Sequence, residues 1–386
     1  MFKARLFKTF PQKKVKCLAC QRYCQINNNQ VGFCQTRLNK DGQLYSLTYG
    51  ILNGIQIDPI EKKPMYHFYP GTQVLSIGSY GCNYRCRQCL NWHCSWGDNA
   101  STMLAKLKID FLSCHPGDPA IAGSIGSRRG FYRLPPKADS LQNDISPQEL
   151  VDLTIKGNYP GIAFTYNEPS IWPEYVYDCA KLAKAKGFYT VFVTNGSWSQ
   201  ETLSYLAPVI DAANIDIKGF YPETYAKMAA FFGKLLAVTE LAIKKYKIFT
   251  ELTTLVIPTI NDSTKELTAI SQWIAKNLGP EIPWHLSRFD PDLSPDEQFK
   301  RLPTTPIATL KKAYEIGKKA GLKHIYVWAP PKNLEEQLFS LEDTFCPKCG
   351  KLVIKRNAWQ PELRGVQKKG KKIICQFCQK KLNLQL

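Results

Sequence analysis

The stretch QVLSIGSYGCNYRCRQCLNW (residues 73–92) joins an apolar run, typical of a buried β-strand, to three cysteines spaced C-x3-C-x2-C. These cysteines are Cys82, Cys86 and Cys89. A metal site normally has four protein ligands, so this loop supplies one ligand too few. Three thiolates can hold three irons of a [4Fe–4S] cluster and leave the fourth iron open to a substrate. We therefore predict an open cluster on this loop.

Two other interpretations of the loop remain. A zinc site would use His93 or Cys94 as a further ligand, and a closed electron-transfer cluster would use Cys94 as its fourth ligand. The spacing itself favours the open cluster, because three closely spaced thiolates on one loop can hold three irons without a further ligand.

Strand and helix patterns alternate from about residue 74 to residue 330, which predicts an α/β domain with a parallel sheet. Active sites of such domains lie at the carboxyl ends of the strands, where the cysteine loop also lies. One helix is expected to begin with Thr305 as its N-cap and Pro306 as its first residue. Residues 97–146 break the alternation and are interpreted as a long surface insertion. The strands expected after the loop are 161–166, 189–196, 213–219, 248–258, 284–289 and 324–330.

Polar side chains follow the predicted strands where each strand ends. Such residues usually belong to turns, but several at successive strand ends indicate one shared cavity. On the expected strand 284–289, His285 and Arg288 lie near the expected cavity. A buried, hydrogen-bonded histidine is the alternative for His285. The candidate residues at the ends of the expected strands 161–166, 189–196 and 213–219 are Asn167, Glu168, Asn195, Gly196, Asp216 and Lys218.

Two further groups of four cysteines lie at the ends of the chain. The C-terminal group has C-x2-C twice, about 25 residues apart, which predicts a zinc ribbon with a structural Zn2+. The N-terminal spacing, C-x2-C-x3-C-x9-C, fits zinc or an auxiliary iron–sulfur cluster equally well. The C-terminal ligands are Cys346, Cys349, Cys375 and Cys378, and the N-terminal ligands are Cys17, Cys20, Cys24 and Cys34.

The net charge of +19 comes entirely from the two ends. Residues 1–40 hold nine Lys/Arg and no acid, and residues 346–386 hold eleven Lys/Arg and one acid, whereas residues 41–345 hold 31 of each. Thiolate metal sites are negative, so these bases are expected mainly to neutralise them. Nucleic acid is a possible but less favoured partner.

The motifs C-x3-C-x2-C, TYNEP, TNG and DIK together resemble the pyruvate formate-lyase activating enzyme branch of the radical S-adenosylmethionine (SAM) superfamily. The resemblance is greater still to the radical SAM enzymes of the AmmeMemoRadiSam system. It covers nearly the whole chain, including RLNKDGQLYSLTYG, FTYNEPSIW, PWHLSRFDPD and FCPKCG. The implied fold is a partial (βα)6, TIM-like barrel with a Cys-rich N-terminal extension and a C-terminal zinc ribbon.

The resemblance also implies an activity. SAM would bind the open iron, and an electron from the cluster would cleave it to a 5′-deoxyadenosyl radical that abstracts hydrogen from an unidentified substrate. Asn167 and Glu168 would contact the methionyl part of SAM, while Asn195, Asp216 and Lys218 would lie on the ribose or substrate side. Independently of the resemblance, the positions of two residues at strand ends suggest that the backbone at Gly196 approaches the ribose and that His285 contacts a carboxylate of SAM or substrate. The sequence departs from the family at Gln88, where an aromatic residue is usual, and in the length of 97–146.

These observations divide the chain into an extension (1–70), a radical SAM core (71–335) and a zinc-ribbon tail (340–386). We expect a cytoplasmic enzyme that uses an electron donor such as ferredoxin or flavodoxin, because the chain has no secretory signal and no membrane-spanning apolar run. A protein or peptide is one candidate substrate. An RNA-modifying radical SAM enzyme and a non-enzymatic zinc-ribbon nucleic-acid-binding protein are the alternatives.

Overall fold

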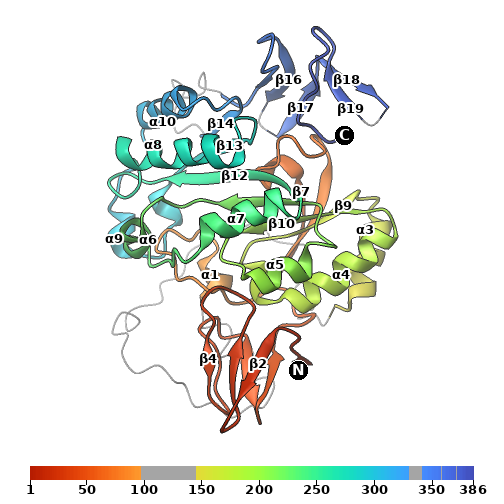
Figure 1. Ribbon diagram of the computed structural model, residues 1–386, viewed down its shortest axis with the longest axis vertical. Helices are drawn as coiled ribbons and strands as arrows, with labels where there is room; N and C mark the ends of the chain where they lie inside the picture. Colours follow the sequence, from red (N-terminus) through yellow and green to blue (C-terminus); the bar gives the residue numbers. More distant parts are fainter. Residues whose placement is uncertain (97–144, 330–340, 358, 371) are drawn as a thin grey trace.

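The centre of the molecule is one eight-stranded sheet with strand order β14-β13-β12-β11-β10-β9-β8-β7 (Figure 1). Neighbouring strands from β8 to β14 are parallel and follow one another in sequence, whereas β7 (Gly54–Pro59) pairs antiparallel with β8. This is the predicted α/β fold with the strand arrangement of a partial barrel. The parallel strands are β8 (Gln73–Gly78), β9 (Gly161–Phe164), β10 (Tyr189–Thr194), β11 (Ala212–Asp216), β12 (Phe249–Val256), β13 (Trp284–Arg288) and β14 (Ile325–Trp328). This computed structural model describes residues 1–96, 145–329, 341–357, 359–370 and 372–386.

Helices connect the parallel strands, and serine N-caps begin several of them. Ser146 forms a capping box with Glu149, and Ser199 and Ser263 each accept a backbone N–H of the first turn. The helices are α1 (Trp92–Ser95), α3 (Pro147–Lys156), α4 (Pro173–Ala185), α5 (Gln200–Leu206), α6 (Pro222–Lys227), α7 (Leu235–Lys244), α8 (Thr264–Trp273), α9 (Glu297–Lys300) and α10 (Ile307–Lys319). Shorter turns are η1 (Ile60–Lys62), η3 (Pro169–Ile171), η4 (Ile274–Leu278) and η5 (Pro291–Leu293).

The predicted start of α10 is wrong by one position. Pro306 is the N-cap and Ile307 is the first helical residue. The hydroxyl of Thr305 donates to the Val256 carbonyl and accepts from the Phe289 N–H, so it joins the ends of β12 and β13 instead of capping the helix. The insertion predicted at 97–146 lies outside the described residues, apart from its last two.

The main core fills the space between the sheet and its helices. Its largest members include Phe164 and Phe192 from strands and Trp172 and Tyr175 from the η3–α4 segment, all at most 1 % exposed. Burying side chains of this size contributes about 1.5–3 kcal/mol each. This core holds the carboxyl ends of the strands, and hence the cysteine loop, in fixed positions.

The N-terminal extension consists of two small sheets, β1-β6-β5 and β2-β3-β4. Arg37 on β5 forms an ion pair of 2.8 Å with Glu174 on α4, and both side chains are at most 1 % exposed. β7 belongs to the central sheet, although the sequence division placed it with the extension. The strands are β1 (Phe2–Lys3), β2 (Phe7–Phe10), β3 (Lys14–Cys17), β4 (Gln25–Ile26), β5 (Arg37–Lys40) and β6 (Gln43–Ser46).

The C-terminal ribbon lies at the opposite end of the central sheet from the extension (Figure 1). Arg356 donates to the Tyr66 carbonyl over 2.6 Å, and Gln385 exchanges backbone hydrogen bonds with His67 and Tyr69. Tyr66–Tyr69 precede β8, so the ribbon packs at the amino ends of the strands. Its strands are β15 (Thr344–Phe345), β16 (Leu352–Asn357), β17 (Gln360–Leu363), β18 (Val366–Lys369) and β19 (Lys372–Cys375). Within the described part of the chain, no helix is long and apolar enough to cross a membrane.

Candidate active site at the carboxyl ends of the strands

The cysteine loop leaves β8 at Gly78 and turns over the end of the sheet. Gly81 has φ +78°, and a Cβ there would lie 2.4 Å from the Cys34 carbonyl oxygen, so only glycine fits. Tyr84 is buried, and its hydroxyl donates to the Phe231 carbonyl. The loop is therefore fixed both to the extension and to the segment after α6.

Cys82, Cys86 and Cys89 are partly buried, free thiols. Burial raises the pKa of each thiol to about 12, and the nearby Lys218 ammonium opposes this shift at Cys86. Without a bound cation these thiols stay protonated at neutral pH. Iron ions supply the positive charge that a buried thiolate requires.

Cys94 is buried beside the loop, and its thiol donates to the Asn91 carbonyl over 3.1 Å. Its own carbonyl accepts the Gly81 N–H over 2.9 Å. These bonds give Cys94 a structural place in the turn that ends the loop.

Asn167 and Glu168 follow β9, as the sequence predicts. The Asn167 amide donates to the Gly81 carbonyl over 2.9 Å, which ties β9 to the cysteine loop. The Glu168 carboxylate is buried and accepts hydrogen bonds from the backbone of Ser170 and Asn195 and from the Thr194 hydroxyl. Burial raises the Glu168 pKa, and these donors oppose the shift. The carboxylate thus joins the ends of β9 and β10.

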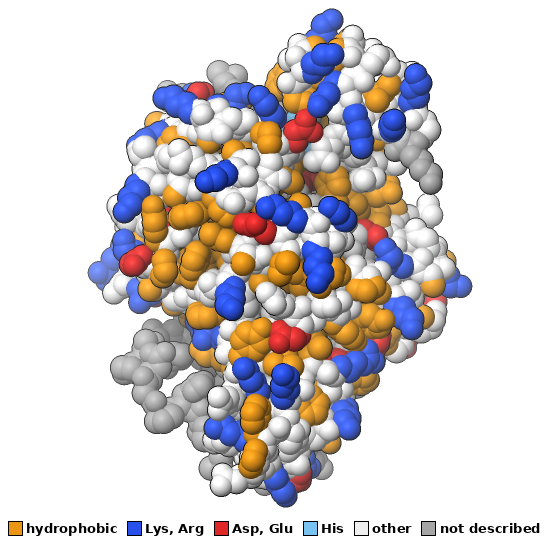
Figure 2. All heavy atoms as spheres, in the orientation of Figure 1, with side chains coloured by type: hydrophobic (Ala, Val, Ile, Leu, Met, Phe, Trp, Pro, Cys, Tyr) orange, Lys and Arg blue, Asp and Glu red, His pale blue; other side chains and the backbone are white. Residues whose placement is uncertain are grey.

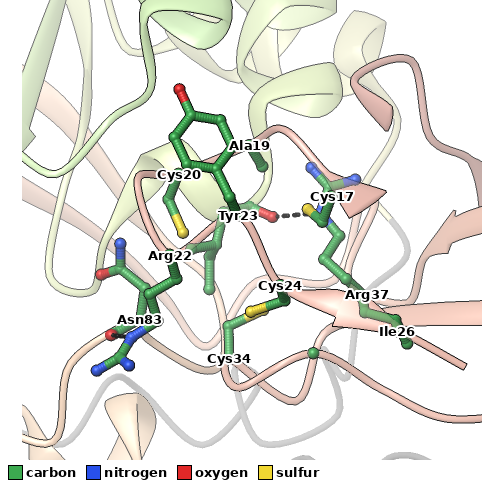
Figure 3. A pocket seen from close by; sticks show the side chains of 12 residues that line it. Cys17, Ala19, Cys20, Arg22, Tyr23, Cys24, Ile26, Cys34, Arg37 and Asn83 are labelled. Atoms are coloured by element: carbon green, nitrogen blue, oxygen red, sulfur yellow. Dashed lines mark hydrogen bonds between the residues drawn. The ribbon is translucent and has the colours of Figure 1, made fainter. Parts of the chain in front are cut away.

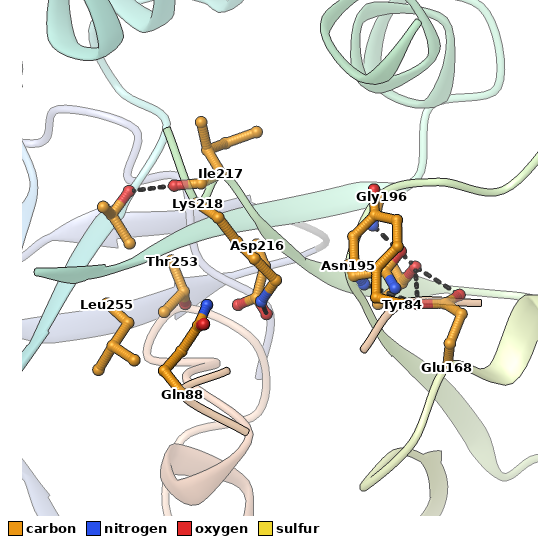
Figure 4. Close-up of polar contacts among 12 residues, drawn as sticks. Tyr84, Gln88, Glu168, Asn195, Gly196, Asp216, Ile217, Lys218, Thr253 and Leu255 are labelled. Carbon is orange, nitrogen blue, oxygen red and sulfur yellow. Dashed lines mark hydrogen bonds and ion pairs between the residues drawn. The ribbon is translucent and has the colours of Figure 1, made fainter. Parts of the chain in front are cut away.

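Asn195 and Gly196 follow β10 and contact the cysteine loop through Asn83 (Figure 4 shows Asn195 beside Glu168 and Tyr84). The Asn195 amide donates to Asn83 Oδ1 over 2.9 Å, and both side chains hydrogen-bond to Ser197. Gly196 has φ +74°, and a Cβ there would collide with Leu235, so glycine is required. Sequence reasoning missed Asn83 and Ser197, because a polar residue between cysteines and a serine in a turn after a strand carry no signal of their own.

Asp216 and Lys218 form an ion pair of 2.7 Å at the end of β11. Burial alone would lower the Lys218 pKa, but the Asp216 carboxylate and the Cys86 thiol outweigh it, and the pKa is raised. The Lys218 N–H also donates to the Tyr225 hydroxyl over 3.0 Å. The Lys218 ammonium, paired with Asp216, thus lies close enough to the cysteine loop to act on Cys86.

Gln88, the residue that replaces the usual aromatic side chain, is 7 % exposed. Its amide nitrogen lies 3.1 Å from the Met228 sulfur, while its Oε1 has no hydrogen-bond partner among the described residues. In Figure 4 the side chain points toward the ends of β11 and β12, near Asp216 and Thr253. A buried acceptor without a donor is costly, so this position calls for a ligand with a hydrogen-bond donor.

His285 lies apart from these residues. Its Nε2 is 2.7 Å from the Glu251 carboxylate, which also accepts the backbone N–H groups of Tyr66 and His67. The ring packs against Tyr66 and Tyr326. This placement, toward the amino ends of the strands, favours the buried structural histidine over the predicted cofactor contact. Arg288 donates to the Thr305 carbonyl over 3.0 Å.

The C-terminal cysteines come together as a metal site. The sulfurs of Cys346, Cys349, Cys375 and Cys378 all lie within 4.8 Å of one another. The predicted ligand set is therefore assembled, although the geometry of four thiols does not distinguish zinc from iron.

Comparison with known proteins places this site in a family. The sequence model of the Radical SAM superfamily matches residues 76–269, half of the chain. The chain belongs to this superfamily, whose members use an iron–sulfur cluster and SAM for radical chemistry. The matched segment runs from β8 to α8 and includes the cysteine loop and every candidate strand-end residue except His285 and Arg288.

Two relatives come from Methanocaldococcus jannaschii. "Uncharacterized protein MJ0808" is 34% identical over 387 residues, covering 100% of both chains. "Putative glycyl-radical enzyme activating enzyme MJ1227" is 28% identical over 260 residues, covering 65% of this chain and 87% of the relative.

Two solved structures are similar in part. A radical SAM methyltransferase from Sphaerobacter thermophilus has a TM-score of 0.44 at 13% identity, covering 68% of this chain and 67% of the other. A domain of pyruvate-formate lyase-activating enzyme from Bacteroides vulgatus has a TM-score of 0.38 at 16% identity, covering 44% of this chain and 99% of the other.

The residues of this chain fit the cofactors that the family implies. Three partly buried thiols with raised pKa lie on one loop, the partly buried Lys218 lies beside Cys86, and Gln88 Oε1, which has no partner among the described residues, lies at the same end of the sheet. Cys82, Cys86 and Cys89 would hold the cluster, and the residues at the ends of β9, β10 and β11 would surround SAM.

Proposed function

We propose that this protein cleaves SAM reductively at a cluster held by Cys82, Cys86 and Cys89, and that the 5′-deoxyadenosyl radical abstracts hydrogen from a separate substrate. When bound, the cluster supplies the electron that breaks the sulfonium bond. The observation that carries the proposal is the loop of three partly buried thiols, beside which the Cys94 thiol donates to the Asn91 carbonyl. That hydrogen bond supports an open fourth iron.

Different residues around the loop are proposed to contact different parts of SAM. Asn167 and Glu168 are occupied with the loop and with β10, so we propose that they position the methionyl side mainly through the backbone they fix. Asn195, Asp216 and Lys218 offer polar atoms for the ribose or substrate side. Gln88 Oε1 is the proposed acceptor for the adenine amino group, because it is buried and lacks a donor within the described protein.

The substrate that we favour is a glycine Cα–H of a partner protein. The support is the relative MJ1227, which is named as a putative glycyl-radical enzyme activating enzyme and matches 65% of this chain. A small one-electron donor protein of the ferredoxin or flavodoxin class would reduce the cluster. We also keep the division of the chain into extension, core and ribbon as a proposal.

A second candidate, RNA modification, is favoured by one observation, the concentration of all excess positive charge in residues 1–40 and 346–386. Figure 2 shows Lys and Arg side chains at both ends of the visible face, mixed with hydrophobic and uncharged ones. Binding that weakens steeply with salt would support this candidate. No binding of tRNA or single-stranded RNA at low salt would exclude it.

An anaerobic assay tests the proposed activity. The protein is reconstituted with iron and sulfide, given SAM and dithionite, and assayed for 5′-deoxyadenosine by mass spectrometry. We expect product from the wild type, a loss of at least about 1,000-fold in Cys86→Ala, and retained product in the matched variant Cys94→Ala. No product from wild type with a spectroscopically verified cluster would refute the proposal. Equal loss in both variants would make Cys94 a ligand and refute the open iron.

A further inference from the structure

The four N-terminal cysteines surround one pocket in the extension (Figure 3). Cys17 ends β3, Cys20 and Cys24 lie in the loop before β4, and Cys34 lies between β4 and β5. Cys17, Cys20 and Cys34 are each 6–7 % exposed, and all four are free thiols. Four thiols, three of them buried and Cys24 partly buried, line one cavity, and four cysteines gathered in this way are the ligand set of zinc and iron–sulfur centres.

The distances between sulfurs separate this site from the ribbon. In the ribbon, Cys346 and Cys378 sulfurs are 3.6 Å apart and Cys349 and Cys375 sulfurs 3.8 Å apart. A tetrahedral ion with metal–sulfur bonds of about 2.3 Å sets its ligands about 3.8 Å apart, so the ribbon fits one ion.

The N-terminal sulfurs are spread more widely. Within the described ranges, the ribbon cysteines are the one group of three or more potential ligand atoms that all lie within 4.8 Å of one another. It follows that no three of the N-terminal sulfurs lie this close together. The same is true of Cys82, Cys86 and Cys89. In a [4Fe–4S] cluster each cysteine binds a different iron, so its ligands stand farther apart than those of one ion. The N-terminal pocket thus lacks the close sulfur spacing of the ribbon's one-ion site, and this favours a cluster over a single ion.

The charge around the pocket fits a metal centre of either kind. Four thiolates leave a net negative charge on a bound ion or cluster, and two guanidinium groups, Arg22 and Arg37, line the cavity. Arg22 stacks on Phe33 at 3.6 Å and donates to the Asn83 carbonyl, which fixes its position. Residues 1–40 contain no acid, and Arg37 is paired with the Glu174 carboxylate of α4, so Arg22 contributes the larger share of the positive charge beside the pocket.

The pocket also touches the SAM-cluster loop. Asn83, which directly follows Cys82, lines the pocket and hydrogen-bonds to Asn195 at the end of β10. The Cys34 carbonyl packs against Gly81 on the other side. The two cysteine groups are therefore separated by little more than the backbone of the loop.

We propose that Cys17, Cys20, Cys24 and Cys34 hold a second [4Fe–4S] cluster. All its irons are bound by cysteine, so it has no open position for SAM, and its chemistry is limited to gaining and losing an electron. The proposal does not depend on the proposed activity, because it concerns ligands that the SAM cluster does not use.

The test removes the first cluster and counts what remains. The full chain carrying Cys82→Ala, Cys86→Ala and Cys89→Ala is reconstituted with iron and sulfide in the presence of zinc, then assayed for iron, sulfide and zinc. We expect about four irons and four sulfides per chain, against about eight of each in the wild type. After reduction, the electron paramagnetic resonance signal of the triple variant should be unchanged by SAM.

Matched variants assign the iron to the pocket. Adding Cys20→Ser and Cys24→Ser to the triple variant should remove the remaining iron, whereas adding Cys346→Ser and Cys375→Ser should leave it and remove the ribbon metal. Circular dichroism and size exclusion verify that each variant is folded. If the Cys20/Cys24 variant does not fold, Cys24→Asp alone should still alter the reduced signal. A triple variant with no iron overturns the proposal, whether zinc fills the pocket or not. If wild-type protein that contains about eight irons per chain does not cleave SAM, that result counts against the proposed function and not against the second cluster.

Discussion

The two ends of the chain carry the same number of cysteines and similar excess charge, yet the structure uses them differently. At the C-terminus the sulfurs are within 4.8 Å of one another, and the ribbon packs at the amino ends of the strands through Arg356. At the N-terminus the sulfurs stand around a pocket that shares Asn83 with the SAM-cluster loop at the carboxyl ends. The carboxyl ends of such barrels carry chemistry and the amino ends carry stability. The position of a cysteine group in the fold is therefore a better guide to its role than the number of its cysteines.

The largest expected effect is the unfolding of the ribbon when its metal is removed. The ribbon core is small, with Val353, Ile354 and Ile373 among its few buried residues, so it depends on the metal to fold. In Cys375→Ser we expect β15–β19 to lose nearly all protection from hydrogen exchange. 5′-Deoxyadenosine formation should stay within about threefold of wild type, because the amino end is not the catalytic end. A ribbon that keeps its protection, or activity that disappears while the barrel stays folded, would contradict this.

The second effect concerns the attachment of the extension. Arg37 and Glu174 are buried together, so Arg37→Met leaves a buried carboxylate without its partner and should cost about 3–5 kcal/mol. The matched change Arg5→Met removes a more exposed pair with Asp178 and should cost about 0–1 kcal/mol. Urea unfolding measures both values, and hydrogen exchange should locate the loss in residues 1–46. An equal loss in the ribbon would contradict the separate attachment of the two ends.

The third effect is acid sensitivity at the amino ends of the strands. Burial, with Lys318 and Lys323 nearby, lowers the His324 pKa to about 4. The unfolded chain therefore binds a proton between about pH 6.5 and pH 4 that the folded chain does not, and stability falls as the pH falls through this window, by about 3 kcal/mol. Urea unfolding at pH 7 and pH 5 should show the loss, and His324→Phe should reduce it. The extension has no histidine in residues 1–46. If the free energy of unfolding falls equally from pH 7 to pH 5 in the wild type and in His324→Phe, His324 is not the source of the acid sensitivity.

The sequence predicted the sheet because its strands are apolar and regularly spaced, and it predicted the candidate positions because Asn167, Asn195 and Asp216 lie at or shortly after the ends of strands. It could not predict what these groups contact. Glu168 is a polar residue at a strand end like the others, but its carboxylate is used by Thr194 and Asn195 of the next strand. The roles in SAM binding remain predictions.

Long-range contacts explain what sequence patterns left open. His285 faces Glu251 and the Tyr66 segment because that segment, more than 200 residues earlier, closes the amino end of the barrel. The pattern along β13 contains no trace of this partner. Likewise, the spacing of the N-terminal cysteines fitted two kinds of metal site, and only the folded loops show how widely their sulfurs stand apart.

The smallest effect tests the carboxyl end directly. If Gln88 Oε1 accepts the adenine amino group, Gln88→Leu keeps the volume and removes the acceptor, at a cost of about 1 kcal/mol, which raises the Kd of SAM by roughly fivefold. Calorimetric titration of the reconstituted protein, without reductant, measures this change apart from turnover. The control Arg364→Gln, on the exposed ribbon, should leave the Kd unchanged. An unchanged Kd in Gln88→Leu would refute the proposed adenine contact, and the Gln88 side chain would then serve only the contact of its amide nitrogen with the Met228 sulfur.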